Sequence, residues 1–220
     1  FKALLKSLES VENADIEVPE SLRLTMRNYQ KTGYRWLKML KENGFGGILA
    51  DDMGLGKSLQ MLALLMERKS TALIICPTTL MLNWVGEIEK FAPGLKALTV
   101  MGGQEERRAQ IARASEYDVV ITSYDLIRRD WELYGDITFD YAVADEAQFI
   151  KNPETKNAVA VKKIKARNRF ALTGTPIENN LGELWSIFDF IMPMYLGSYS
   201  SFKDKYELGI VRGDKIPPRD

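Results

Sequence analysis

A glycine-rich segment between two apolar stretches constrains the fold of this chain more than any other feature. It runs from Asp51 to Ser58 and reads Asp-Asp-Met-Gly-Leu-Gly-Lys-Ser. The apolar run at residues 47–50 predicts a strand before it, and the residues after it are apolar at helical spacing. Glycines let backbone N–H groups close around a polyphosphate, and a helix that begins near Lys57 directs its positive end at that anion. The segment therefore predicts a strand–loop–helix unit that binds phosphate.

Two side chains at the end of this loop have the chemistry that a nucleoside triphosphate site requires. Lys57 would reach the outer phosphates as a point charge, and the Ser58 hydroxyl would bind the Mg²⁺ ion that bridges them. The other loop residues predicted to contact the nucleotide are Asp52, Met53, Gly54, Leu55 and Gly56. The match to the G-x-x-x-x-G-K-[ST] pattern is incomplete, because its first position is Asp51. A glycine-rich turn that caps an ordinary helix is the alternative.

Apolar runs alternate with segments of helical period along the rest of the chain. We expect strands near residues 47–50, 72–76, 95–100, 118–122, 141–144 and 169–173. This alternation is typical of an α/β domain, with a mostly parallel sheet and helices on both faces. In such sheets ligands bind beyond the carboxyl ends of the strands, which is where the glycine-rich loop begins.

Two adjacent carboxylates follow the predicted strand at residues 141–144. Asp145 has the expected position of a Mg²⁺-binding aspartate, and Glu146 is placed to orient or deprotonate a water molecule. A helix start with acidic residues in its first turn is the alternative. A phosphate loop and a strand-end acidic pair together form the arrangement that hydrolysis of a nucleoside triphosphate requires. We therefore predict Lys57, Asp145 and Glu146 as catalytic residues, and Ser58 and Asp145 as the metal ligands.

Composition excludes several other kinds of site. The chain has no histidine, which excludes Ser-His and Cys-His triads and most zinc sites. Its one cysteine, Cys76, lies in an apolar run and is expected to be a small buried side chain. Thirty basic and thirty acidic residues give a net charge of zero, so any contact with nucleic acid must be local. No apolar run is long enough for a membrane span, and we expect no membrane partner.

Six motifs occur in order along the chain, at residues 26–30, 49–60, 76–84, 121–124, 145–148 and 172–180. Together they resemble the first RecA-like lobe of the Swi/Snf family of DNA-dependent ATPases, in helicase superfamily two. The resemblance extends from about Leu24 to Phe190, and family members commonly carry an acidic residue where Asp51 stands. It implies a RecA-like P-loop domain, ATP and Mg²⁺ as cofactors, and double-stranded DNA as a partner.

The resemblance also assigns roles to single residues. Gln30 resembles the glutamine that reads the adenine edge, which suits an amide because it can pair with N6 and N7. Arg27 is implied to frame the same pocket, with a solvated helix-start residue as the alternative. Gln148 replaces the usual histidine of its motif. It is implied to act in coupling hydrolysis to movement, with Thr173, Gly174 and Thr175, for which a simple strand-to-helix turn is the alternative.

Another group of residues resembles the segments that follow the backbone of one DNA strand in this family. They are Pro77, Thr78, Asn83, Ser123 and Tyr124. Hydroxyls, amides and backbone N–H groups suit phosphate contacts, which position DNA without reading its sequence. We expect Trp84 in the core instead. Basic clusters at residues 107–108, 128–129 and 162–169 either extend a DNA surface or form solvated faces.

The resemblance implies a motor that moves on double-stranded DNA. Residues 1–20 would be a helix remnant and linker, and residues 21–220 one monomeric lobe of an excised fragment. In the family a second RecA-like lobe of the same chain supplies an arginine typically worth about 10³–10⁵ in rate. The isolated lobe should therefore bind ATP weakly and hydrolyse it slowly or not at all. The Thr-Gly-Thr-Pro motif argues against a DEAD-type RNA helicase, and no strand-separating element is apparent.

Two other functions are alternatives to a motor for a chain with these motifs. A non-catalytic module for nucleotide sensing or partner docking is the alternative, although it need not keep Lys57, Ser58, Asp145 and Glu146 together. A small-molecule kinase is disfavoured because no substrate-binding lid is apparent. Compact spacing between the motifs favours a prokaryotic source. We therefore expect a cytoplasmic, nucleoid-associated protein, or a nuclear one if the source is eukaryotic.

Overall fold

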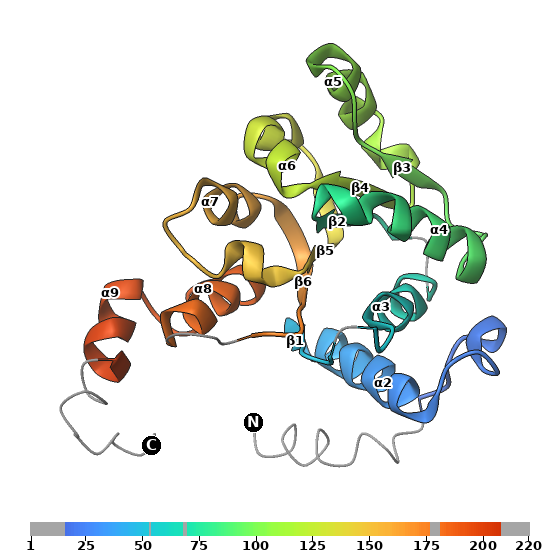
Figure 1. Cartoon of the computed structure of the whole chain (residues 1–220), viewed down its shortest axis with the longest axis horizontal. Helices are drawn as coiled ribbons and strands as arrows, with labels where there is room; N and C mark the ends of the chain where they lie inside the picture. The colour runs from blue at the N-terminus through green and yellow to red at the C-terminus, as the bar shows by residue number, and fades with distance from the viewer. Residues whose placement is uncertain (1–15, 53, 68–69, 177–180, 208–220) are drawn as a thin grey trace.

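The computed structural model describes residues 16–52, 54–67, 70–176 and 181–207. Within these ranges, parallel strands form one sheet in the order β1-β6-β5-β2-β4-β3 (Figure 1). The strands are β1 (Gly47–Leu49), β2 (Ala72–Cys76), β3 (Ala97–Thr99), β4 (Val119–Ser123), β5 (Thr138–Asp145) and β6 (Lys165–Leu172). The predicted parallel α/β sheet is confirmed.

Helices cover both faces of this sheet (Figure 1). The α-helices are α2 (Asn28–Glu42), α3 (Lys57–Leu65), α4 (Met81–Phe91), α5 (Gln104–Ala112), α6 (Tyr124–Asp130), α7 (Lys156–Lys162), α8 (Leu181–Ile191) and α9 (Tyr199–Phe202). Short 3₁₀ turns are η2 (Glu20–Leu22), η3 (Thr78–Leu80), η4 (Ala114–Glu116), η5 (Trp131–Tyr134) and η6 (Ala147–Ile150), and η7 (Lys203–Glu207) is a π turn. Helices α2 to α4 pack on one face and α5 to α8 on the other. None of the described helices is long and apolar enough to cross a bilayer.

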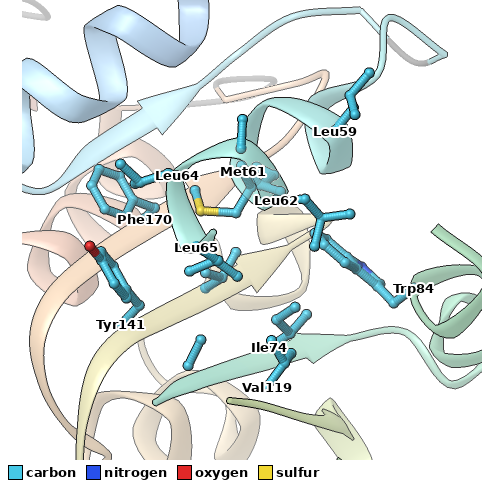
Figure 2. Close-up of a cluster of buried hydrophobic side chains, with 14 of the residues drawn as sticks. Leu59, Met61, Leu62, Leu64, Leu65, Ile74, Trp84, Val119, Tyr141 and Phe170 are labelled. Atoms are coloured by element: carbon cyan, nitrogen blue, oxygen red, sulfur yellow. The ribbon is translucent and has the colours of Figure 1, made fainter. Parts of the chain in front are cut away.

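The core has two layers because successive side chains of a strand point to opposite faces. In β2, Ile74 and Cys76 pack with the α2–α4 layer, whereas Leu73 and Ile75 pack with the α5–α8 layer. Figure 2 shows the first layer, in which leucines of α3 lie over Ile74 and the neighbouring strands. Both faces of β2 are covered, so the whole strand is buried, as is usual in parallel sheets. The expected burial of Cys76 is confirmed.

Two strands begin earlier than predicted, because their first residues are polar. The predicted strands started at Tyr141 and Arg169, but pairing begins at Thr138 and Lys165. Asp140 in this extension accepts a hydrogen bond from the Thr71 N–H at 3.0 Å and forms an ion pair with Arg167 at 2.7 Å. Polar contacts therefore hold the early part of the β5–β6 pair, together with Phe139, which is fully buried.

The N-terminal segment is only partly described. Residues 1–15 of the predicted remnant and linker lie outside the described residues, so that assignment stays a prediction. Ile16 and Val18 pack against the core layer of α2. The Tyr34 hydroxyl donates to the Glu17 carbonyl at 3.2 Å, and Arg35 Nε donates to the Ile16 carbonyl at 3.0 Å. These bonds attach the start of the described chain to α2.

Candidate nucleotide-binding site

A pocket of about 310 Å³ opens at the carboxyl end of the sheet, between α3, α4 and the end of β5. Its lining residues are Gly54, Gly56, Lys57, Ser58, Leu80, Asn83, Trp84, Glu87, Asp145 and Glu146. The structure therefore brings together the predicted catalytic residues and metal ligands, which come from distant parts of the chain. This is the edge at which α/β sheets bind ligands.

The glycine-rich loop has a backbone that only glycine adopts easily. Gly54 and Gly56 have φ values of 81° and 74°, in the left-handed region. Lys57 Nζ donates to the carbonyls of Asp51 at 2.8 Å and Asp52 at 3.1 Å, so its ammonium group lies in the curve of the loop. Met53, predicted to contact the nucleotide, lies outside the described residues.

Asp51 has a structural role that accounts for its departure from the usual glycine. Gln60 Nε2 donates to Asp51 Oδ2 at 3.0 Å, and Gln60 is fully buried in α3. This bond ties the start of the loop to the helix that follows it. An aspartate at this position therefore fixes the loop from outside the phosphate cradle.

Gln30 lies directly against the loop. Its Nε2 donates to the Leu55 carbonyl at 3.0 Å, and its Oε1 accepts from the Arg27 N–H at 2.9 Å. Tyr29 also donates to the Leu55 carbonyl, at 3.2 Å. A Cβ atom on Gly56 would lie 2.4 Å from Gln30 Nε2, so the absent side chain permits this approach. The structure places Gln30 beside the pocket, and its predicted adenine contact and that of Arg27 stay predictions.

Asp145 is a largely buried carboxylate, with 8% of its surface exposed, at the end of β5. Burial raises its pKa, although hydrogen bonds oppose this rise. Trp84 Nε1 donates to Oδ2 at 2.8 Å, and the Glu146 N–H donates to Oδ1 at 3.0 Å. Trp84 is buried as expected, but its contact with Asp145 was not predicted. A buried indole N–H normally finds an acceptor, but the sequence does not identify which residue supplies it.

Glu146 begins a chain of hydrogen bonds that leaves the pocket. Its backbone has φ 50° and ψ 57°, a left-handed conformation that is strained for a non-glycine residue. Gln148 Nε2 donates to Glu146 Oε2 at 2.8 Å, and Thr173 Oγ1 donates to Gln148 Oε1 at 3.0 Å. The Thr175 N–H then donates to Thr173 Oγ1 at 3.1 Å, across Gly174. The predicted coupling residues are thus bonded to the predicted water-activating acid.

The pocket also fits a Mg²⁺ ion. Mg²⁺ prefers oxygen ligands and is commonly held by one or two carboxylates together with substrate phosphates. Asp145 and Ser58 supply a carboxylate and a hydroxyl on the same pocket. Among the described residues there is no cluster of three or more metal-binding side chains, and a Mg²⁺–nucleotide site does not need one. Glu87, which sequence reasoning missed, accepts a hydrogen bond from Ser58 Oγ at 3.2 Å.

The predicted DNA-contact residues divide into two groups. Thr78 is exposed and Pro77 is half-buried at η3, while Asn83 is exposed and lines the nucleotide pocket. Ser123 and Tyr124 are buried, so neither side chain faces solvent in the described lobe, and their predicted contact with DNA stays a prediction. They are on β4 and the start of α6, facing inward.

Both buried residues support the local structure instead. Ser123 Oγ caps α6 by accepting from the Leu126 N–H at 3.2 Å. The Tyr124 hydroxyl donates to the Asp145 carbonyl at 2.8 Å, and its ring stacks on Phe149 with centroids 5.1 Å apart. Burial raises the pKa of this phenol well above its ordinary value. Tyr124 therefore fixes the main chain of the acidic pair.

One predicted basic cluster is also corrected. Arg107 is buried and forms a two-pronged pair with Asp130, at 2.6 and 3.0 Å, so it is neither a DNA surface nor a solvated face. Arg128 is exposed but pairs with Asp125 at 3.2 Å. Lys162 pairs with Asp189 at 2.9 Å. Arg107, Arg128 and Lys162 are therefore paired with acids within the lobe, whereas Arg108 and Arg129 are exposed.

Comparisons with known proteins agree with this geometry. The family model of the SNF2-related domain matches residues 29–216. The putative ATP-dependent helicase/translocase YwqA of Bacillus subtilis is 43% identical over 218 residues, which are 96% of this chain and 24% of that protein. The TATA-binding protein-associated factor MOT1 of Saccharomyces cerevisiae is 39% identical over 207 residues, 86% of this chain and 11% of that protein.

A solved structure is similar in both fold and sequence. The Sulfolobus solfataricus SWI2/SNF2 ATPase core in complex with dsDNA aligns with a TM-score of 0.78 and 44% identity, over 86% of this chain and 40% of that one. The chain thus spans less than half the length of each of these relatives. The match in fold, the family model and the relatives agree. The chain therefore belongs to the SNF2-related domain family.

Proposed function

We propose that this chain is the ATP-binding lobe of a Swi/Snf-type motor that couples ATP hydrolysis to movement on double-stranded DNA. The observation that carries the proposal is the chain of hydrogen bonds from Glu146 through Gln148 to Thr173 and Thr175. A nucleotide sensor needs only to hold ATP. A motor must also transmit the state of its catalytic acid to another part of the molecule, and this chain provides such a connection.

The pocket residues divide the chemistry among them. Lys57 would bind the outer phosphates, and Ser58 and Asp145 would hold Mg²⁺, which would supply positive charge beside the phosphoryl group. Glu146 orients the attacking water and accepts its proton. Gln148 bonds to Oε2 of Glu146, and the carboxylate keeps further lone pairs for the attacking water.

The rest of the motor lies in other parts of the parent protein. We propose that a second RecA-like lobe of the same chain closes over the pocket and supplies an arginine, and that this lobe by itself is a monomer that binds DNA weakly. The similarity to a SWI2/SNF2 core solved with dsDNA supports the DNA partner. Relatives in Bacillus subtilis and Mycoplasma genitalium support a prokaryotic source. For such a source we propose a cytoplasmic, nucleoid-associated protein.

Measuring ATP turnover with and without duplex DNA tests this function. We compare the 220-residue chain with a longer protein that includes the following lobe, and with Glu146→Gln in the longer form. The chain alone should turn over slowly, the longer protein should be stimulated by DNA, and Glu146→Gln should lower its rate by about 10²–10⁴, the range for a lost general base. Glu89→Gln, at an exposed position of α4, is the matched control. A longer protein that binds ATP but never hydrolyses it would instead indicate a sensing or docking module.

A further inference from the structure

Helix α4 presents one face to the nucleotide pocket. Leu80 at its N-cap, Asn83, Trp84 and Glu87 all line the pocket, at the i, i+3, i+4 and i+7 spacing of a single helix face. The phosphate loop and the strand-end acidic pair supply the groups that would bind the nucleotide. The proposed chemistry gives no task to Trp84 or Glu87, although both form hydrogen bonds to residues with such tasks.

Trp84 holds the carboxylate of Asp145 in one orientation. The indole reaches from α4 toward α3 and the sheet (Figure 2), and only 3% of its surface is exposed. Its N–H is a donor without acceptor capacity, and it bonds to Oδ2 at 2.8 Å. The Glu146 N–H bonds to Oδ1, so each carboxylate oxygen has one donor and keeps a further lone pair. Asp145 is therefore fixed but still able to bind a cation.

Glu87 gives Ser58 a similar constraint. Ser58 Oγ donates its proton to Glu87 Oε2 at 3.2 Å, from one helix to the next. A hydroxyl has one proton and two lone pairs, so directing the proton at Glu87 leaves the lone pairs for another partner. Both residues line the same pocket as Asp145. One helix thus orients two oxygen ligands that come from different elements.

We propose that α4 positions the metal–nucleotide site, with Trp84 orienting the Asp145 carboxylate and Glu87 orienting the Ser58 hydroxyl. The inference rests on the proposed function, because it takes Mg²⁺–ATP as the ligand. Trp84 and Glu87 act through the ligands and are positioning residues. Partners that orient a metal ligand typically change metal affinity by about 10–100-fold. Their loss should therefore weaken the Mg²⁺-dependent part of ATP binding more than the part that needs no metal.

Calorimetric titration of the 220-residue chain with ATP, in excess Mg²⁺ and separately in EDTA, tests the proposal. Trp84→Phe keeps an aromatic ring but removes the N–H donor. We expect its affinity for Mg²⁺–ATP to fall about tenfold, the lower end of that range, with metal-free affinity unchanged. Glu87→Ala, at a half-buried position, should also lower the ratio of the two affinities. Glu87→Gln keeps an acceptor oxygen and should restore part of this ratio.

Trp185→Phe is the matched control. It removes another indole donor, which bonds to the Gly197 carbonyl at 3.2 Å and does not line the pocket. Both of its ATP affinities should equal those of the wild type. If Trp84→Phe and Glu87→Ala keep the wild-type ratio, or if both affinities fall together with the melting temperature, the positioning role is overturned. If the wild-type chain itself shows no Mg²⁺-dependent ATP binding, the proposed function fails, and this inference fails with it.

Discussion

Gln148 connects two parts of the site through one amide group. It donates to Glu146 and accepts from Thr173, so Gln148→Ala removes both bonds at once. We expect ATP turnover by the longer protein to fall about 10–100-fold, less than the loss of about 10²–10⁴ expected when the general base itself is removed. Mg²⁺–ATP affinity should stay nearly constant, because Gln148 does not line the pocket. Single-turnover rates and equilibrium titrations separate the two effects.

Two other substitutions at this position sharpen the test. Gln148→His keeps one donor and one acceptor nitrogen and should retain most activity. Gln148→Glu can accept from Thr173 but places a second carboxylate beside Glu146, so it should be at least as damaging as alanine. Wild-type turnover in Gln148→Ala would contradict the coupling role.

Cys76 offers a measurement of opening at the centre of the sheet. Burial, together with the charge of Asp145, raises the pKa of its thiol from an ordinary 9.0 to about 12. At pH 8 only about one molecule in ten thousand then has this thiol ionised. The Cys76 side chain is also fully buried. We expect a thiol reagent such as DTNB to react only as fast as the sheet opens, and at full speed in urea. Rapid labelling of the native chain would contradict this burial.

The same shift has a consequence for stability at alkaline pH. The folded state holds the thiol proton more tightly than the unfolded state does. The stability contributed is therefore complete below about pH 9 and is lost as the pH rises from 9 toward 12. A Cys76→Ala variant should lose less stability than the wild type between pH 8 and pH 10, as urea titrations at both pH values would measure.

Single residues of the site were predictable where a local pattern carried the information. Lys57 ends the glycine-rich loop and Asp145 follows an apolar strand, and the structure places both in one pocket. The Trp84–Asp145 bond was not predictable, because its partners are 61 positions apart and a pattern identifies a buried face rather than its contact. The burial of Tyr124 was not predicted for a related reason, since motif membership says nothing about which way a side chain points.

At the scale of elements, α2 and α3 approach each other closely at Gly33. A Cβ atom there would lie 1.8 Å from Gln60 Oε1, in a site where Gln60 is fully buried and holds Asp51. Gly33→Ala should therefore lower the free energy of unfolding by about 1–3 kcal/mol, as overpacking typically does. It should also weaken ATP binding, because the start of the phosphate loop is displaced. Urea unfolding and nucleotide titration measure both effects.

Gly86 provides the matched control in another helix interior. It is exposed on α4, and a Cβ atom there meets nothing within 4 Å. Gly86→Ala should raise stability by about 0.5–1 kcal/mol, because alanine loses less backbone entropy on folding. Equal effects at the two glycines would show that helix propensity, not the α2–α3 contact, decides the result.

Element boundaries were predictable in proportion to how apolar the ends of an element are. The β2 boundaries were predicted correctly, because every residue of this strand is buried. The first residues of β5 and β6 were missed, since Thr138, Asp140 and Lys165 carry no apolar signal. Their pairing depends on polar contacts between distant segments, such as that of Asp140 with Arg167.

At the scale of the whole molecule, the two core layers share every strand of one sheet. Unfolding either layer exposes the strands that the other layer packs against, so we expect one cooperative transition in urea. Trp36 reports on the α2–α4 layer and Trp131 on the α5–α8 layer. One variant keeps only Trp36 of the four tryptophans, and another keeps only Trp131. In each, the midpoint of unfolding measured by fluorescence should coincide with the midpoint measured by far-UV circular dichroism. Separate midpoints would show that the layers unfold independently.

The order of the strands is the part of the architecture that sequence patterns did not reveal. Alternating apolar runs predicted a parallel sheet, but β1 pairs with β6, where Gly47 faces Phe170 from the far end of the chain. This pairing places the phosphate loop beside the coupling loop, and the Thr173 N–H donates to the Leu49 carbonyl at 3.1 Å. Which strands become neighbours depends on packing over the whole chain, and no local window contains that information.

Because the sheet is parallel, all its strands begin at the end opposite the nucleotide pocket, and this end can serve as a point of attachment. The turn at residues 92–96 leads into the amino end of β3, and Pro93 and Gly94 in this turn are exposed. A side chain at Gly94 would meet nothing within 4 Å. A cysteine introduced there, in a chain whose natural thiol is buried, would take a single dye or a surface tether. Immobilised molecules would then present their nucleotide pockets to the solution, all in the same orientation.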